Sequence, residues 1–188
     1  MTSLNIVAVV ENNIDDMALG FREEVRKSDY MITYHELSDE ELLKKARNVF
    51  ENLIKWIISP PSQKNVGEYF SGLGAERLRE GFPLSEVNYA LYLSKKVFWK
   101  FTFENYNKIN GLDNRSLIEF IHELNNYFDI GEFFIIRGYL EELFSYLGNT
   151  GRFSKEELES FLVKGALYKE TVRTIKDKLD GGELGFTK

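Results

Sequence analysis

Cysteine is absent from the 188 residues of the chain, which excludes disulfide bonds, thiolate metal sites and cysteine nucleophiles. Histidine is nearly absent, and His35 and His122 alone are too few for a multi-histidine metal centre. No apolar run reaches the roughly 18 to 20 residues that span a bilayer. We therefore expect a cytoplasmic protein with neither a bound metal nor a membrane span.

Proline is also scarce, with 3 residues, which argues against a turn-rich all-β chain. Hydrophobic residues make up 43% of the sequence and aromatic residues 14%, enough for one core filled largely by rings. The net charge of -6 argues against nucleic acids and anionic membranes as partners, because both attract clustered Lys and Arg. We predict an all-α multi-helix bundle of about six helices. The bundle is expected over residues 1–151, followed by a C-terminal helix and tail over residues 152–188.

The first helical pattern covers residues 4–27. One face of it holds an apolar row at helical spacing, namely Ile14, Ala18, Phe21 and Val25. Its opening, residues 4–10, also fits a short buried strand, but we prefer a helix because no partner strand is visible downstream. The linker over residues 28–37 carries aromatic side chains, so we expect it to pack on the bundle.

Two capping boxes mark the starts of later helices. Ser38 and Glu41 form the first, because the serine oxygen can accept from the third helical N–H while the glutamate reaches back. The helix that it opens is stopped by the prolines at 60–61, since a residue before proline is pushed out of helical geometry. Its expected buried stripe is Leu42, Ala46, Val49, Leu53 and Trp56. Ser154 and Glu157 form the second box and open the last helix.

Residues 66–103 carry two amphipathic helical patterns that meet at a sharp corner. Gly81 can take the left-handed conformation that ends a helix. Pro83 is suited to the first position of the next helix, where its missing N–H costs nothing. This corner is therefore encoded locally.

A long helix is expected after the corner pair, with Asp113 as its N-cap and residues 148–151 as its end. Gly131 lies inside the pattern. It marks a bend, a close helix crossing or an ordinary glycine tolerated at about 1 kcal/mol.

The last helix carries an apolar seam whose members alternate three and four residues apart for roughly three heptads, as in a coiled coil. The seam residues are Leu158, Phe161, Tyr168, Val172, Ile175 and Leu179, with Gly165 at the position between Phe161 and Tyr168. They predict either a partner helix in a homodimer or docking on the body of the same chain, and the sequence leaves both open.

Motifs of catalytic chemistry are missing, so no catalytic residue is assigned and we predict that the protein is not an enzyme. Glu119 and His122 have the Glu-x-x-His spacing of di-iron bundles. A second such motif is lacking, because Ile32 stands three residues before His35. A di-metal site is therefore not predicted.

A ligand pocket between aromatic-rich helices is the alternative to a pure interaction module. His122 is the candidate haem-iron ligand, because a lone histidine on a buried helix can fill that role, although a core histidine is commoner. Arg77 is a candidate ligand contact or a member of a solvated charged face. Tyr89 and Trp99 complete the candidate ligand-binding residues. The main interpretation assigns no cofactor.

The corner also carries a resemblance to a known family. Leu73-Gly74, Arg77 and the run EGFPLSEV over residues 80–87, followed by an aromatic-rich helix, resemble the N-terminal domain of the RsbRD group of RsbT co-antagonist proteins. Residues 38–42 are similar to the start of that family's second helix. The same domain type stands at the front of some bacterial histidine kinases. Phe21 departs from the pattern, at a position where the family usually has tryptophan.

The resemblance covers residues 10–147 and implies an all-helical input domain of bacterial stress signalling. Such a domain would sense a signal or partner, dimerise, and pass a change through its C-terminal helix to a downstream protein or domain. The chain would be either a stand-alone member or the front piece of a longer protein. We therefore predict a non-enzymatic, homodimeric regulatory domain, with a small-molecule or haem sensor as the alternative.

Overall fold

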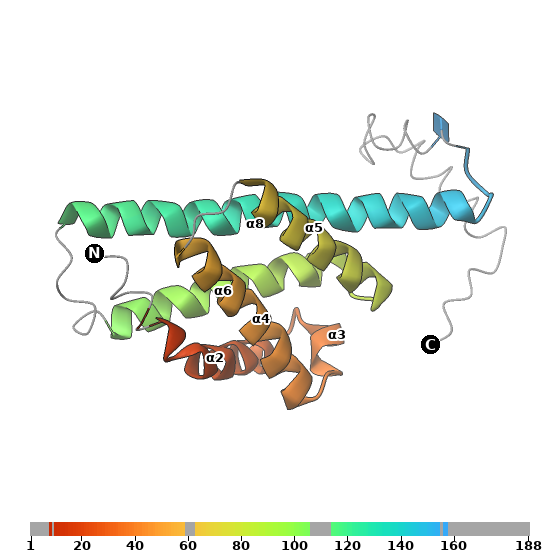
Figure 1. Ribbon diagram of the computed structural model, residues 1–188. Coiled ribbons are helices and arrows are strands. Elements are labelled where there is room, and N and C mark those ends of the chain that lie inside the picture. Colours follow the sequence, from red (N-terminus) through yellow and green to blue (C-terminus); the bar gives the residue numbers. More distant parts are fainter. Residues whose placement is uncertain (1–7, 9, 59–62, 106–113, 155, 158–188) are drawn as a thin grey trace. The chain divides into compact units, whose positions relative to one another are not determined.

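The structure is a computed structural model that describes residues 8, 10–58, 63–105, 114–154 and 156–157. Within these residues six helices are defined and no strand occurs (Figure 1). They are α2 (Ile14–Lys27), α3 (Ile32–His35), α4 (Asp39–Ile58), α5 (Gln63–Arg79), α6 (Leu84–Glu104) and α8 (Asn114–Asn149). The predicted all-α class is confirmed. The chain divides into two compact units, Met1–Leu140 and Glu141–Lys188, and the packing described below lies in the first. The boundary at residue 151 stays a prediction.

The first helical segment is interrupted where the sequence predicted continuity. Residues 8, 10 and 11 are helical, but Asn12 and Asn13 form a turn, and α2 begins only at Ile14. Asparagine favours turns because its side chain hydrogen-bonds locally and competes with the helix backbone. The prediction of one helix over residues 4–27 is therefore wrong at this turn. Phe21 is buried on α2, as its predicted role as an aromatic core residue requires.

Helix α4 starts at the predicted capping box. The amide of Ser38 donates to Glu41 Oε2 at 2.9 Å, and the amide of Glu41 donates to Ser38 Oγ at 3.2 Å. The predicted stripe of α4 is buried as well, with each of its members at 9% exposure or less: Leu42, Ala46, Val49, Leu53 and Trp56. The start and the inner face of α4 are thus both confirmed.

The linker before α4 packs on the bundle and contains the short helix α3. Side chains from two other helices hold its ends. Glu86 of α6 accepts the amides of Thr33 and Tyr34 at 2.9 and 3.3 Å. Arg26 of α2 donates to the carbonyls of His35 and Leu37 at 3.0 and 2.7 Å. Helix α3 is therefore tied to both α2 and α6.

The corner between α5 and α6 is a Schellman turn. Gly81 has φ +84°, its amide donates to Leu78 O at 2.9 Å, and the amide of Phe82 donates to Arg77 O at 3.0 Å. Pro83 lies at the N-cap of α6 with an extended ψ of 139°, one residue earlier than predicted. Its carbonyl accepts the amides of Glu86 and Val87, so the proline starts the helix without having to donate.

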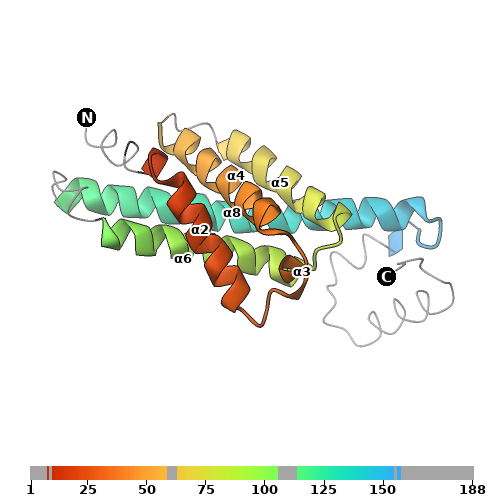
Figure 2. The ribbon, with the colours of Figure 1, turned by 90° about the horizontal axis from the view of Figure 1, so that it is seen from below.

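Within the first unit, α2 lies across α4 and α6 (Figures 1 and 2). Helices α6 and α8 run antiparallel, because Asn88 hydrogen-bonds Glu132 while Lys95, further along α6, bonds Asp129, which is earlier on α8. Aromatic rings fill much of the interior between these helices, and the largest fully buried ones are Phe50, Phe70, Phe98, Tyr127 and Phe128.

Helices α5 and α8 cross with almost no side chain between them. A Cβ on Gly74 would lie 2.9 Å from the backbone N of Tyr139, and one on Gly138 would lie 2.5 Å from Ser71 Cα. About two turns before Gly74, Gly67 faces the ring of Phe134, and about two turns before Gly138, Gly131 faces the ring of Phe70. Of the readings that the sequence left open for Gly131, the close crossing is therefore the one observed.

Helix α8 runs unbroken through Gly131 and ends at Asn149, with Gly151 at φ +67° in the turn that follows. The second capping box is formed, since the amide of Ser154 donates to Glu157 Oε2 at 2.9 Å and the amide of Glu157 donates to Ser154 Oγ at 3.1 Å. The seam residues, Leu158 to Leu179, lie outside the described residues.

Alanine at Gly74 should destabilise the protein by about 1 to 3 kcal/mol, because its methyl group would collide with the backbone of α8. Gly72 on the same helix is the matched control. Nothing lies within 4 Å of its added Cβ, so Gly72→Ala should stabilise by up to about 1 kcal/mol through helix propensity. Urea unfolding followed by circular dichroism measures both. Equal stability of the two variants would show that the crossing is looser than described.

Candidate functional site

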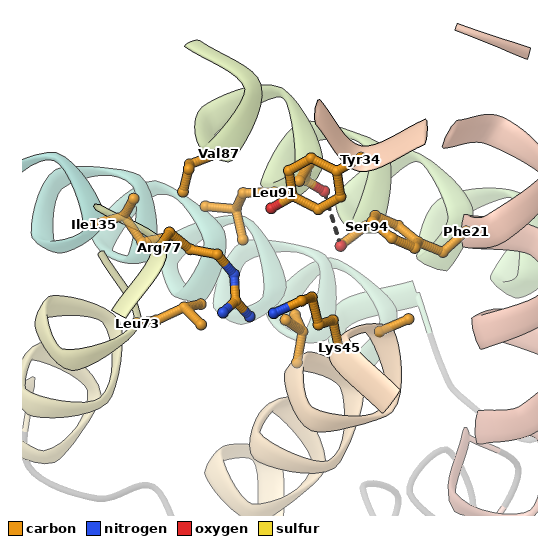
Figure 3. Close-up of a pocket in the computed structure, with 12 residues that line it drawn as sticks. Phe21, Tyr34, Lys45, Leu73, Arg77, Val87, Leu91, Ser94 and Ile135 are labelled. Carbon is orange, nitrogen blue, oxygen red and sulfur yellow. Dashed lines mark hydrogen bonds between the residues drawn. The ribbon is translucent and has the colours of Figure 1, made fainter. Parts of the chain in front are cut away.

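A small cavity lies in the first unit, where α2, α3, α4, α5, α6 and α8 meet (Figure 3). Its volume is about 30 Å³, which is room for ordered water but not for a metabolite. Most of its wall is apolar, from side chains such as Phe21 and Leu91, and the polar part comes from Tyr34, Lys45, Arg77 and Ser94. Ser94 Oγ donates to the carbonyl of Ala90 at 2.9 Å, so its hydroxyl is satisfied within α6.

A larger groove of about 490 Å³ lies between α4 and α5, within the size range of small-molecule sites. Its lining is charged throughout except for one asparagine: Glu41, Lys44, Lys45, Arg47, Asn48, Glu51, Glu76, Arg77 and Glu80. Four side chains are acidic and four are basic, so the groove is formally neutral. It therefore presents both signs of charge to any occupant.

Arg77 and Lys45 line both hollows and form the wall between them. Figure 3 shows their charged ends turned toward each other. Both bind the same carboxylate: Lys45 Nζ donates to the two oxygens of Glu80 at 2.8 and 2.9 Å, and Arg77 Nη1 donates to Glu80 Oε2 at 2.7 Å. Arg77 Nη1 also donates to Glu76 Oε1 at 3.0 Å. The side chain of Arg77 is only 7% exposed and that of Lys45 16%, so the two cations are largely shielded from water, whereas Glu80 and Glu76 are 35% and 53% exposed.

The ring of Phe82 connects this network to the corner. Lys45 Nζ lies 5.4 Å and Arg77 Cζ 6.0 Å from the ring centroid, within the range of cation–π attraction. The ring of Tyr34 packs on Phe82 with centroids 4.5 Å apart. Tyr139 of α8 donates its hydroxyl to the Phe82 carbonyl at 2.8 Å. One residue of the corner thus contacts α3, α4, α5 and α8.

Burial fixes the charge states at the site. It raises the pKa of Tyr34 to about 12, against the opposing effect of the Arg77 charge, so the phenol stays protonated at neutral pH. Partial burial of the Glu80 carboxyl tends to raise its pKa. The hydrogen bond from Lys45 and the charge of Arg77 outweigh this effect and hold the pKa of Glu80 below its ordinary value. The wall between the two hollows is therefore an ionised cluster at physiological pH.

This arrangement can bind charge but offers no evident nucleophile with an adjacent base. Among the described residues, no group of three or more His, Asp or Glu side chains is placed to hold a metal ion. Nor does any described helix combine the length and apolarity that crossing a membrane requires.

The structure does not bring the four predicted ligand-binding residues together. Of these four residues, Arg77 lines both the cavity and the groove. Tyr89 is half-buried and stacks on Tyr92, and Trp99 is half-buried beside Phe103. His122 is exposed on α8, so its position gives the haem hypothesis no buried ligand.

Sequence reasoning missed Lys45 and Glu86. Lys45 lies directly before Ala46 of the buried stripe, and this position beside an apolar row was the signal that it is partly covered. Glu86 is 7% exposed although the helical pattern assigned it no partner. Its partners are amides of α3, 52 and 53 residues away, which no local pattern indicates.

Replacing Glu80 with glutamine should cost about 1 to 3 kcal/mol of stability, because Arg77 and Lys45 lose their shared anion while remaining largely buried. The control is Glu23→Gln, which breaks the exposed pair with Lys27 and should change stability by less than about 0.5 kcal/mol. Denaturant unfolding at pH 7 compares them. Equal losses would contradict a special role for the buried network.

The effect of Glu80→Gln should also depend on pH. Because the folded pKa of Glu80 lies below its ordinary value of 4.5, its contribution is complete above that value. The contribution is lost as the pH falls through the folded pKa. The stability gap between wild type and variant should therefore close in acid, and a gap that persists would contradict the assignment.

Comparison with known proteins gives one family. Residues 11–150 match the RsbT co-antagonist protein rsbRD N-terminal domain, and this span includes all six helices from α2 to α8. Neither a search of curated proteins nor a search of solved structures found a match. The matched span covers most of the 188 residues and contains the EGFPLSEV corner, so the chain belongs to the family of RsbT co-antagonist protein rsbRD N-terminal domains.

Proposed function

We propose that the protein is a non-enzymatic input domain that receives a signal or a partner, forms a homodimer, and passes a change through its C-terminal helix to a downstream protein or domain. Membership of this family places the chain among regulatory signalling domains of the stress response. The finer points rest on physical arguments from the site.

The observation that carries the proposal is the position of Phe82. Its ring lies against Arg77 and Lys45 at the wall of the groove, while the corner that contains it joins α5 to α6. Four residues further on, Glu86 holds the start of α3. A change in the charges at the groove would therefore act on the corner and, through it, on α3, α5 and α6. A local event would in this way affect the whole domain.

A small-molecule sensor is the second candidate, and the groove favours it over the interior cavity. The cavity of about 30 Å³ holds no more than water, whereas the groove of about 490 Å³ has room for a metabolite. A buried guanidinium and a nearly buried ammonium at its wall suit an anionic group. Exposed carboxylates such as Glu51 suit a cationic group on the same ligand.

The homodimer is tested by sedimentation velocity on the full chain. We expect a dimer in which polar replacement of the seam residues Leu158, Phe161, Val172 and Ile175 weakens association at least tenfold, because a heptad seam associates through its apolar positions. An unchanged dimer in this variant would contradict the seam as the surface through which the chains associate. A monomeric wild type would contradict the proposed homodimer itself.

The sensor candidate is tested by thermal unfolding in the presence of inorganic phosphate, citrate or glycine at matched ionic strength. At least one probe should raise the Tm of the wild type, since a ligand that binds only the folded state stabilises it. Lys45→Met should abolish that rise, and Lys27→Met, which removes an exposed lysine outside the groove, should leave it intact. Equal Tm values with all three probes would count against a groove ligand of these classes.

A further inference from the structure

A row of aromatic side chains follows the solvent side of α6. We call it the aromatic stripe, and its members are Tyr89, Tyr92, Trp99 and Phe103. Tyr92 is 55% exposed and Phe103 72%, while Tyr89 and Trp99 are half-buried. At 1.5 Å per residue the stripe is about 21 Å long. Neither hollow described above includes any of its members.

The rings of the stripe contact one another in pairs, and Tyr89 and Trp99 also pack against the core. Tyr89 stacks on Tyr92 with centroids 5.4 Å apart, and Trp99 lies 6.0 Å from Phe103. Tyr30, from the turn after α2, widens the stripe by packing edge-on to Tyr89 at 5.8 Å, and it is 73% exposed. Two exposed aromatic groups on one helix face, Tyr30–Tyr89–Tyr92 and Trp99–Phe103, are typical of an interaction surface.

The charges beside the stripe are already paired. On the α2 side, Lys96 Nζ donates to Glu24 at 2.6 Å, and on the α8 side, Lys95 Nζ donates to Asp129 at 2.9 Å. The stripe therefore consists of aromatic residues on either side of Lys96, and the charge of Lys96 is paired within the chain. Because Lys95 and Lys96 are both paired within the chain, neither presents an unpaired charge that would repel an identical surface.

The spacing of the stripe makes it self-complementary. Counted from Lys96, its aromatic residues stand at −7, −4, +3 and +7. Reversing the helix direction about Lys96 gives +7, +4, −3 and −7, which is the same pattern to within one residue. An antiparallel copy of α6 would therefore place Tyr89 against the partner's Phe103 and Tyr92 against the partner's Trp99. Lys96 itself would face its equivalent, with its ammonium drawn aside to Glu24.

We propose that the aromatic stripe is the contact face between two copies of this chain, with α6 packed antiparallel on α6 of the partner about a two-fold axis at Lys96. This deepens the proposed homodimer and rests on it. An aromatic side chain buries roughly 150 to 250 Å² in full, so five half-exposed rings supply on the order of 500 Å². That is more than half of the roughly 800 Å² per partner in a standard interface. Binding to a different protein would not require aromatic residues spaced symmetrically about Lys96.

The absence of cysteine allows a sharp test by single-cysteine crosslinking of the full chain. Lys96→Cys should give a disulfide-linked dimer on mild oxidation, because a residue on a two-fold axis meets itself. Tyr89→Cys and Phe103→Cys should not crosslink alone, since each lies about 21 Å from its own equivalent along the paired helices. An equimolar mixture of these two variants should crosslink. Lys44→Cys, exposed in the groove, controls for chance collision.

A second measurement does not depend on disulfide geometry. Tyr92→Glu should weaken the dimer at least tenfold in sedimentation velocity while leaving the helical circular dichroism unchanged, because the side chain is more than half exposed in a single chain. A wild-type dimer that survives Tyr92→Glu and gives no Lys96→Cys crosslink would overturn this surface and leave the proposed homodimer standing. A monomeric wild type would overturn both.

Discussion

Burying the guanidinium of Arg77 is the constraint on which the rest of the structure depends. A cation that is only 7% exposed must be paired, and two carboxylates and two aromatic rings lie around this one. Glu80 pairs with it because the Schellman turn at Gly81 ends α5 just after that carboxylate. The same turn places Phe82 over the cations and starts α6 in the direction that brings Glu86 to α3.

The features that sequence reasoning predicted are those that depend on neighbouring residues. Capping boxes, a glycine at a left-handed turn and an apolar stripe act over one or two helical turns, and Ser38, Gly81 and Leu53 are placed as expected. The error at Asn12–Asn13 is of the same local kind, since two successive asparagines favour a turn that the apolar pattern hid.

The features that sequence reasoning missed are contacts between residues that are distant in the chain. Lys45 and Glu80 are 35 residues apart and Glu86 and Thr33 are 53 apart, so their pairing depends on how the helices stack. The seam at Leu158 and beyond stays a prediction for a different reason, because the seam residues lie outside the described residues. The EGFPLSEV run combines both kinds of feature. Its turn depends on neighbouring residues, whereas Phe82 and Glu86 within it contact α8 and α3, which are distant in the chain.

The glycine crossing of α5 and α8 has a mechanical consequence. Where Gly74 meets Tyr139 and Gly138 meets Ser71, two backbones touch, and no flexible side chain is present to absorb sliding. Such a contact acts as a fulcrum: α5 can rock about it but cannot slip along α8 without collision. Arg77 and Glu80 lie within two turns of that fulcrum. A small displacement at the groove would therefore be levered into a larger one at the far end of α5.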